Sequence, residues 1–268
     1  MSELPGRLVL LGHPVAHSLS PRFQNAALRA AGIPLVYEAI DVPPQALRRT
    51  LSELASVRAS GNVTIPHKED VAACCQRLTP LAQRCGAVNT FWHDDGQLVG
   101  DNTDVGGVDA IAALLLGDAR PTATVALLGA GGSAAAVVAA VERWGDAHVR
   151  LYNRNVDRAH LLAARFGAIV DVVHSVEEAL DGVALVVNAT PVGLKDDAFP
   201  VPVRALPREA AVFDLVYRAN ETAWVRAARE AGHRAADGEG MLVEQGALSF
   251  ERWFGMAPDR DAMWRALR

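Results

Sequence analysis

Short apolar runs alternate with helical patterns along the N-terminal part of the chain. We expect strands at residues 8–11, 35–40 and 61–65, and helices at residues 21–31 and 44–54. Strands that alternate with helices in this way usually belong to a mainly parallel sheet with helices packed on it. The pattern therefore predicts an α/β domain with a mainly parallel sheet in this part of the chain.

A second and more regular series follows a helix that we expect at residues 104–116. Its strand-length apolar runs lie at residues 124–128, 148–152, 185–188 and 212–216, with helical stretches between them. This spacing is typical of a Rossmann-type, doubly wound nucleotide-binding sheet. Residues 240–254 are again apolar at helical spacing, and we expect this last helix to pack against an earlier part of the chain.

The composition of the chain limits the kinds of molecule that it is expected to bind. Half of the 268 residues are hydrophobic, the formal net charge is −5, and no run of Lys or Arg occurs, so neither nucleic acid nor an anionic membrane is favoured. The N-terminus lacks the features of a signal peptide, and no apolar stretch is long enough to span a bilayer. No set of residues has metal-ligand spacing. We expect a cytoplasmic monomer or homodimer that acts on a small molecule without a metal.

Lysine is rare in this chain. Of the 26 basic residues only Lys68 and Lys195 are lysines, and the others are arginines. Arg stays protonated in proteins, whereas Lys can lose its charge. A Lys retained in an Arg-rich chain marks a position where proton transfer could be required, with chance placement as the alternative.

A glycine-rich turn follows the predicted strand at residues 124–128 and opens an Ala- and Val-rich helix. Its residues are Gly129, Ala130, Gly131, Gly132 and Ser133. In dinucleotide-binding proteins the first Gly permits the tight turn, and the next lets backbone N–H groups approach a pyrophosphate at the helix N-terminus. We interpret the turn as the site of a nicotinamide dinucleotide, the alternative being a tight turn between packed elements.

The end of the following strand bears on the choice of cofactor. It reads Asn153-Arg154-Asn155, and Arg158 lies one turn further. An NAD-selective fold places Asp or Glu there for the ribose 2′-hydroxyl, whereas a guanidinium can pair with a 2′-phosphate. The sequence therefore favours NADP(H) over NAD. Solvated residues at a helix start are the alternative for the two arginines.

Polar clusters stand at the ends of the first predicted strands, where open α/β sheets bind their ligands. They read GHPVAHSLSP at 12–21, NVTIPHK at 62–68, AVNT at 87–90 and DNTD at 101–104, and GEGMLVEQ follows at 238–245. With the glycine turn, this ordered set resembles shikimate dehydrogenase from residue 12 to residue 254. The resemblance implies NADP-dependent, reversible reduction of 3-dehydroshikimate to shikimate, a step of aromatic amino-acid biosynthesis.

The resemblance also implies two domains with different functions. A substrate-binding domain would comprise residues 1–104 and 238–268, and a dinucleotide-binding Rossmann domain residues 105–237. The residues that match the family's substrate-binding positions are Ser18, Ser20, Thr64, Asn89, Tyr217 and Gln245. Those expected to contact NADP(H) are Gly129, Ala130, Gly131, Gly132, Ser133, Asn153, Arg154, Arg158, Thr190 and Gly240. Helix capping for either serine and edge packing for the tyrosine are the alternatives.

Lys68 and Asp104 match the family's catalytic pair. Reduction of a ketone by hydride leaves negative charge on the carbonyl oxygen, so the site needs a proton donor or a cation there. An ammonium group fits both roles, and the resemblance implies that the carboxylate orients it. Whether Lys68 acts mainly as a proton donor or as an electrostatic stabiliser stays open at this point.

Three stretches depart from the family's pattern. Gln24-Asn25 stands where His-Asn is usual, Arg218-Ala219-Asn220 replaces Asn-Pro-Leu, and Asn155 replaces a Thr. None of them belongs to the catalytic pair, but they bear on substrate choice. A quinate/shikimate or aminoshikimate dehydrogenase therefore remains an alternative. A non-catalytic NADP-binding redox reporter is an alternative from a different class.

Overall fold

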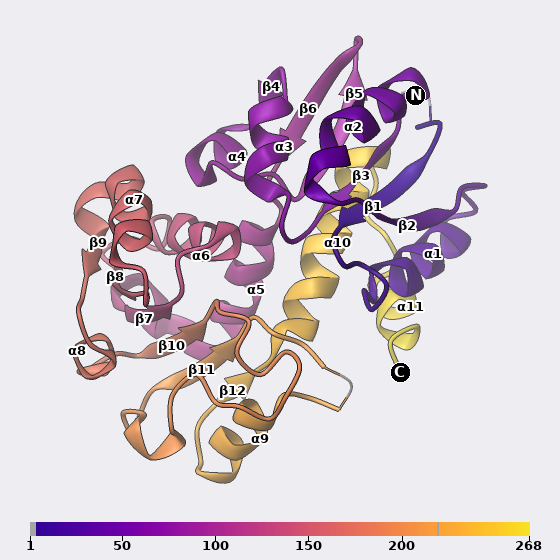
Figure 1. Cartoon of the computed structure of the whole chain (residues 1–268). Coiled ribbons are helices and arrows are strands. Elements are labelled where there is room, and N and C mark those ends of the chain that lie inside the picture. The colour runs from indigo at the N-terminus through magenta and orange to yellow at the C-terminus, as the bar shows by residue number, and fades with distance from the viewer. Residues whose placement is uncertain (1–3, 219) are drawn as a thin grey trace. The chain divides into compact units, whose positions relative to one another are not determined.

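The computed structural model describes residues 4–218 and 220–268 (Figure 1). The chain forms two compact units, one of Met1–Thr103 with Leu242–Arg268 and the other of Asp104–Met241. Each unit contains an α/β sheet, which confirms the predicted fold class.

The strands of the first unit follow the order β2-β1-β3-β5-β6-β4. They are β1 (Leu8–Gly12), β2 (Tyr37–Asp41), β3 (Ser60–Val63), β4 (Arg77–Leu78), β5 (Thr90–Asp94) and β6 (Gln97–Asp101). β1 pairs in parallel with β2 and β3, and β4 pairs in parallel with β6. β5 runs antiparallel to both of its neighbours. The sheet thus has the mainly parallel character that was predicted, with one reversed strand.

The reversed strand comes from a hairpin that the sequence analysis did not predict. β5 and β6 are joined by Asp95 and Gly96, whose φ angles are +49° and +75°. Positive φ at two successive residues is typical of the tight turn that suits the twist of a hairpin, and Asp-Gly is one of its preferred pairs. The dipeptide is visible in the sequence as a hairpin signal.

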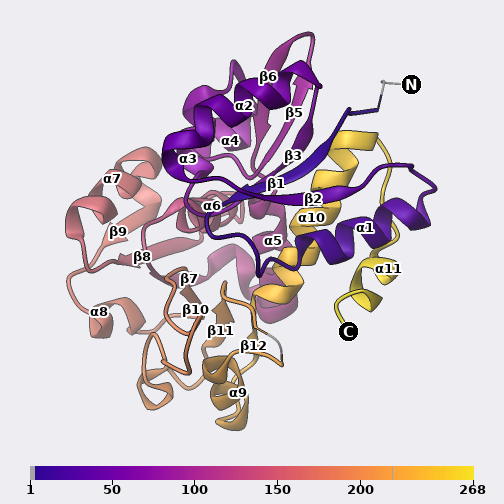
Figure 2. The same cartoon turned by 45° about the vertical axis from the view of Figure 1, so that its right-hand side comes forward.

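The helices of the first unit pack on both faces of its sheet (Figures 1 and 2). They are α1 (Ser20–Ala30), the 3₁₀ turn Pro44–Ala46 leading into α2 (Leu47–Ser56), α3 (Lys68–Cys74), α4 (Pro80–Cys85), α10 (Gly238–Phe254, which begins in the second unit) and α11 (Arg260–Arg265). Side chains of β1 alternate between the faces. Val9 and Leu11 join the core beneath α2, whereas Leu8 and Leu10 join the core of α1 and α10.

The strands of the second unit are all parallel to their neighbours, in the order β12-β11-β10-β7-β8-β9. They are β7 (Thr124–Leu128), β8 (His148–Tyr152), β9 (Val170–Val172), β10 (Leu185–Asn188), β11 (Ala211–Asp214) and β12 (Ala235–Ala236). The chain reverses direction across the sheet between β7 and β10. That is the switch point at which doubly wound sheets bind their ligands.

Helices connect these strands in the second unit. They are α5 (Asp104–Leu116), α6 (Gly132–Val141), α7 (Val156–Phe166), α8 (Val176–Leu180) and α9 (Ala223–Glu230), with 3₁₀ turns at Gly117–Thr122, Gly167–Ile169 and Val203–Ala205. From Ala134 to Val141 every residue of α6 is buried. A helix apolar on all sides fits only where other elements cover it.

The Gly246→Ala variant tests the packing of α10 on α1. A Cβ at Gly246 would lie 2.4 Å from an atom of the Phe23 ring. Ala would favour the helix by up to about 1 kcal/mol, but the overlap should cost more, so we expect a net loss of about 1–3 kcal/mol in the free energy of unfolding. Urea denaturation measures it. In a Phe23→Leu background the loss should shrink, and an undiminished loss would contradict the packing argument.

Candidate active site

The glycine turn connects β7 to α6 with the geometry that a dinucleotide requires. Gly129 has a φ of +110°, and a Cβ there would lie 2.8 Å from the carbonyl oxygen of Ala189. Gly131 precedes the helix in an extended conformation, and a Cβ there would meet no atom within 4 Å. One Gly therefore permits the turn, while the other leaves the backbone open at the positive end of a helix. This cradle fits a pyrophosphate.

The residues after β8 are arranged for a second anionic group. Asn155 caps α7, its Oδ1 accepting a hydrogen bond from the backbone N–H of Arg158 at 3.1 Å. Asn153 is half-buried and donates to the carbonyl oxygen of Asn155 at 2.7 Å. Arg154 and Arg158 are exposed, and within the described ranges neither guanidinium has a carboxylate partner. Both are available to a phosphate.

A buried carboxyl organises the loops after β10 and β11. Asp214 accepts hydrogen bonds from the Asn188 side chain at 2.8 Å, from the backbone N–H of Val216 at 3.1 Å and from the Thr222 hydroxyl at 2.9 Å. Asn188 in turn accepts from the backbone N–H and the hydroxyl of Thr190, at 3.0 and 2.6 Å. Burial raises the pKa of Asp214 to about 6, although these bonds oppose the shift. The loops of Thr190 and Tyr217 are thus tied to one side chain.

Three predicted substrate segments meet at one edge of the first sheet. The backbone N–H of His13 donates to the carbonyl oxygen of Ile65 at 3.0 Å, which joins the serine loop to the loop of Thr64 and Lys68. The backbone N–H of Val88 donates to the carbonyl oxygen of Lys68 at 2.8 Å, which brings in the segment of Asn89. These motifs therefore lie together at the ends of the strands, as predicted from the sequence.

The predicted residues of this edge differ in exposure. Ser18 is half-buried, and its Oγ accepts from the backbone N–H of Ser20 at 3.2 Å. Ser20 is buried and is the first residue of α1, whose N-cap position is Leu19, without a side-chain cap. Neither serine is therefore the N-cap of α1. Thr64 and Lys68 are half-buried.

A closed group of buried polar side chains lies behind this edge. We call it the polar cluster; its members are Tyr37, Asn62, Asn89, Thr90, Thr103, Gln245 and Ser249, and none is more than 8% exposed. The hydroxyls of Thr90, Thr103 and Ser249 lie 2.6–3.1 Å from one another. Asn62 donates to Thr90 and Ser249 at 3.0 and 2.8 Å and accepts from the Tyr37 hydroxyl at 2.8 Å. β3, β5 and α10 are joined through it.

Backbone groups fix the orientation of the Asn89 and Gln245 amides in the polar cluster. Asn89 Oδ1 accepts from the backbone N–H of Thr103 at 2.7 Å, and Asn89 Nδ2 donates to Gln245 Oε1 at 3.0 Å. Gln245 Nε2 donates to the carbonyl oxygen of Leu242 at 2.8 Å. An N–H can only donate and a carbonyl can only accept, so neither amide can flip. The second Nε2 hydrogen of Gln245 remains for a ligand acceptor such as a hydroxyl oxygen.

Comparison with known proteins places this geometry in a family. A model of the shikimate dehydrogenase substrate binding domain matches residues 10–91, and one of the shikimate 5′-dehydrogenase C-terminal domain matches residues 238–268. A shikimate dehydrogenase (NADP(+)) of Mesorhizobium japonicum is 40% identical, over 100% of this chain and 97% of its own. The chain belongs to the shikimate dehydrogenase family. The resemblance inferred from the motifs is thereby confirmed.

Solved shikimate dehydrogenases share the whole fold. The crystal structure of the enzyme from Aquifex aeolicus has a TM-score of 0.91 at 34% identity and covers 100% of both chains. The enzyme from Thermus thermophilus, solved in complex with NADP(H) and shikimate, has a TM-score of 0.87 at 40% identity and covers 99% of both chains. The likeness therefore extends over both units.

The positions that depart from the shikimate dehydrogenase pattern have structural roles here. Gln24 is buried, and its Nε2 donates to the carbonyl oxygen of Gly246 at 2.9 Å, which joins α1 to α10 beside Gln245. Arg218 pairs with Asp197 at 2.8 Å and so links two loops of the second unit. Ala219 lies outside the described residues. Substrate choice at these positions stays a prediction.

The remaining predicted residues lie in the second unit. Asp104 is buried and is the first residue of α5. Gly240 is half-buried in the first turn of α10, where a Cβ would lie 2.7 Å from Ile111. Tyr217 is half-buried directly after the loop that Asp214 orders. A small residue at Gly240 thus satisfies packing, and its contact with a cofactor stays a prediction.

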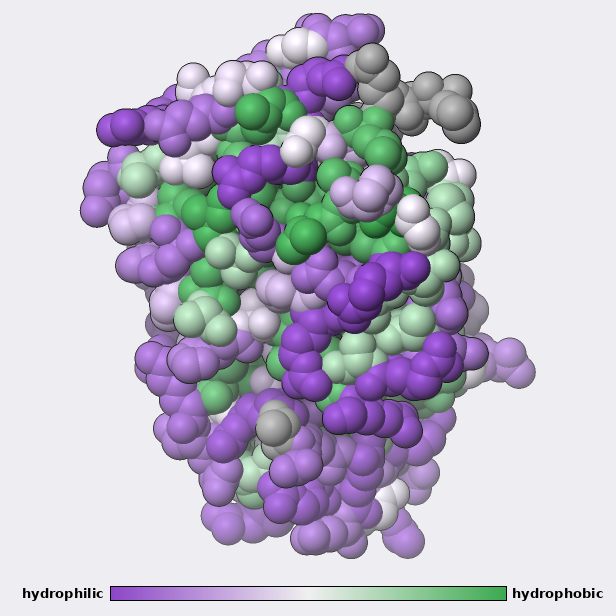
Figure 3. Space-filling view, turned by 90° about the vertical axis from the view of Figure 1, so that its right-hand side faces the viewer, coloured by the Kyte–Doolittle hydropathy of each residue, from purple (hydrophilic) through white to green (hydrophobic). Residues whose placement is uncertain are grey.

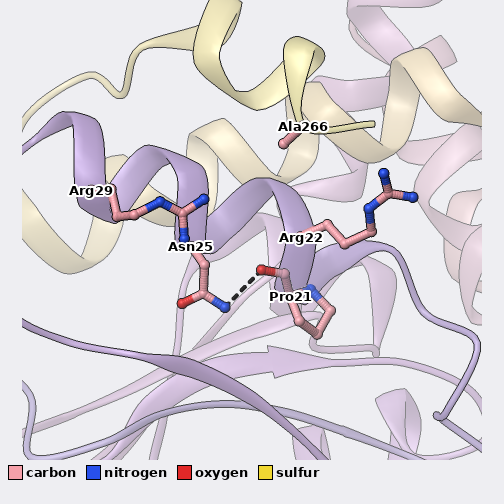
Figure 4. Close-up of a pocket in the computed structure, with 5 residues that line it drawn as sticks. All are labelled: Pro21, Arg22, Asn25, Arg29 and Ala266. Atoms are coloured by element: carbon pink, nitrogen blue, oxygen red, sulfur yellow. Dashed lines mark hydrogen bonds between the residues drawn. The ribbon is translucent and has the colours of Figure 1, made fainter. Parts of the chain in front are cut away.

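A separate depression on the first unit contains none of the predicted residues. It lies between α1 and α11 and is lined by Pro21, Arg22, Asn25, Arg29 and Ala266 (Figure 4). Asn25 donates to the carbonyl oxygens of Pro21 and Tyr37 at 2.8 and 2.9 Å and so joins α1 to β2. Figure 3 shows the side of the molecule on which α1 and α11 lie in Figure 1. Hydrophobic side chains gather in its upper half, and hydrophilic ones prevail below.

The chain has three cysteines, Cys74, Cys75 and Cys85. The cysteines are free, and burial, together with Cys74, raises the pKa of the Cys75 thiol to about 12. Among the described residues no group of His, Cys, Asp or Glu is placed to hold a metal ion. No described helix is both long and apolar enough to cross a bilayer.

The Asp214→Asn variant tests the buried carboxyl through the pH dependence of stability. The pKa of Asp214 is raised from 3.8 to about 6 by burial, so the folded protein favours the protonated form. The stability that this preference contributes is fully present below the unfolded pKa and is lost as the pH rises through about 6. The advantage of the wild type over the variant should therefore fall by up to about 3 kcal/mol between about pH 4 and pH 7.

Urea denaturation at a series of pH values measures this difference, with the exposed Asp146→Asn substitution as the control. The control should follow the wild type throughout the range. If the free energies of unfolding of Asp214→Asn and the wild type differ by the same amount at every pH, burial does not disfavour the ionised form of Asp214. The proposed burial of this carboxyl between the two loops would then be wrong.

Proposed function

We propose that this protein is an NADP(H)-dependent shikimate dehydrogenase that reduces 3-dehydroshikimate to shikimate reversibly, as a cytoplasmic monomer or homodimer. The observation that carries the proposal is the edge of the first sheet. There the serine loop, the loop of Thr64 and Lys68, and Asn89 are joined by backbone hydrogen bonds beside the polar cluster. Relatives that are 40–43% identical over 96–100% of this chain are named shikimate dehydrogenase (NADP(+)).

The second unit would bind the cofactor. The turn Gly129–Ser133 would hold the pyrophosphate at the start of α6, and Asn153, Arg154 and Arg158 would hold the 2′-phosphate. Thr190 would lie by the nicotinamide, and Gly240 would approach the cofactor from α10. When bound, NADPH supplies the hydride that reduces the ketone. The open space above Gly131 and the exposed guanidinium groups support this assignment.

The first unit would bind the substrate. Ser18 and Ser20 would hold the carboxylate through their hydroxyls. Thr64, Asn89 and Gln245 would hydrogen-bond the ring hydroxyls, because a buried hydroxyl left unpaired costs about 1–3 kcal/mol. Tyr217 would approach from the loop after β11. The fixed orientation of Gln245 supports its role, since its remaining hydrogen matches a hydroxyl oxygen.

Lys68 and Asp104 would carry the catalysis. In the direction of reduction the Lys68 ammonium would donate a proton to the carbonyl oxygen as negative charge develops on it. Asp104 would accept a hydrogen bond from that ammonium and hold it in place. In the direction of oxidation the amine of Lys68 would take the proton from the substrate hydroxyl. This role uses the property that distinguishes Lys from the arginines of the chain.

Replacing Lys68 by Ala tests the catalytic assignment. We expect kcat to fall by at least about 10²-fold, the scale of a lost general acid–base, while far-ultraviolet circular dichroism stays unchanged. Shikimate oxidation followed by the absorbance of reduced nicotinamide measures it. Lys195→Ala is the matched control, because Lys195 is exposed and is the only other lysine. A Lys68→Ala enzyme with near-normal kcat would refute the role.

Replacing Arg154 by Ala tests the cofactor site. Loss of a guanidinium from the 2′-phosphate should raise KM for NADP⁺ by about tenfold or more, as for a charge-assisted hydrogen bond of about 1.5–3 kcal/mol. KM for NAD⁺ should hardly change, because NAD⁺ lacks that phosphate. Steady-state kinetics with both cofactors measures the ratio, with the exposed Arg208→Ala as the control. Equal effects on both cofactors would place Arg154 elsewhere.

A further inference from the structure

The segment that leads into Asp104 is anchored at each of its side chains. Asp101, 1% exposed, accepts from Arg252 Nε of α10 at 2.7 Å, from the backbone N–H of Asn102 at 2.8 Å and from the Thr79 hydroxyl. Asn102, fully buried, donates from Nδ2 to the carbonyl oxygen of Ala87 at 2.9 Å. The segment is thereby held to α10 and to the stretch before Asn89.

Thr103 makes the third and most connected anchor. Its backbone N–H donates to Asn89 Oδ1 at 2.7 Å, and its Oγ1 accepts from Asn89 Nδ2 at 2.9 Å. The same Oγ1 lies 3.1 Å from the hydroxyl of Thr90 and 3.0 Å from that of Ser249. Thr103 is 4% exposed. Its hydroxyl is engaged by protein groups, and the residue precedes Asp104 by one peptide bond.

We propose that Thr103 is a positioning residue, whose hydroxyl holds the Asn89 amide and the backbone entering Asp104 in the arrangement that substrate binding and proton transfer require. The inference rests on the proposed function, because it takes Asn89 and Asp104 as substrate-binding and catalytic groups. One side chain then couples the binding of the ring hydroxyls to the orientation of the catalytic carboxylate.

The Thr103 hydroxyl should matter more for the position of the Asn89 amide than the bulk of the Thr103 side chain. Without Thr103 Oγ1, Asn89 Nδ2 loses an acceptor that it has in the wild type. A buried N–H that lacks a partner raises the free energy of this arrangement and lets the side chain shift toward another acceptor. The backbone N–H of Thr103 would still hold Asn89 Oδ1, so the amide would keep its facing but not the position in which it meets the substrate. Val has the shape of Thr without the hydroxyl, whereas Ser keeps the hydroxyl and loses only a methyl group.

Steady-state kinetics of the full-length Thr103→Val and Thr103→Ser variants tests the proposal, with shikimate and NADP⁺ as substrates. We expect Thr103→Val to lower kcat/KM for shikimate by about tenfold or more through both kcat and KM, as for a buried group left unpaired. KM for NADP⁺ should stay within about twofold. Thr103→Ser should restore most of the kcat/KM. Thr124→Val, in β7 of the other unit, is the matched control and should behave as wild type.

The outcomes separate this inference from the proposed function. If the wild type fails to oxidise shikimate, the proposed function is wrong and the inference falls with it. If the wild type is active and Thr103→Val keeps its kcat/KM, or Thr103→Ser loses as much as Thr103→Val, the positioning role alone is wrong. If Thr103→Val does not fold, Thr90→Val and Thr90→Ser replace it, because the Thr90 hydroxyl lies next to that of Thr103. Thr90→Val should then lower kcat and raise KM for shikimate, and Thr90→Ser should restore most of both.

Discussion

The hydrogen bonds between Asn89, Thr103 and Gln245 are the constraint on which the substrate half of this protein depends. Their atoms are buried, and buried polar groups tolerate few arrangements because each unpaired one costs about 1–3 kcal/mol. The polar cluster therefore holds β3, β5, α10 and the segment entering Asp104 in one mutual geometry. It also explains why the C-terminal helix returns to the first unit: α10 supplies both Gln245 and Ser249, which complete the cluster.

In the second unit, a buried carboxyl takes the place of the buried amides and holds the neighbouring loops. Asp214 and Asn188 stand at the carboxyl ends of neighbouring parallel strands, and each accepts hydrogen bonds from a loop that would face the cofactor or the substrate. Burial raises the pKa of Asp214, because removal from water disfavours its ionised form. In both units, a side chain buried at a strand end orders the segment beside it. The fold and the site are therefore specified by the same contacts.

Much of this organisation could be predicted from the sequence, for physical reasons that particular elements make clear. β7, β8 and β10 have the predicted bounds because buried parallel strands are continuous apolar runs, and Gly129 was recognised because few residues adopt its φ. β9 and β12 were missed because they are too short to show a pattern. Thr90, Thr103, Asp214 and Ser249 were missed as structural residues, because only the fold shows which polar side chains become buried partners. An Asp at the end of an apolar strand, as at Asp214, was the one available signal.

We expect this enzyme to be selective for shikimate and for NADP(H). The most direct test is a steady-state measurement of kcat/KM in which shikimate and quinate are each combined with NADP⁺ and NAD⁺. The account predicts the highest value for shikimate with NADP⁺, since Arg154 and Arg158 favour the 2′-phosphate. A higher value with NAD⁺ or quinate would contradict it in part, and tight NADP(H) binding without turnover of either substrate would contradict it altogether.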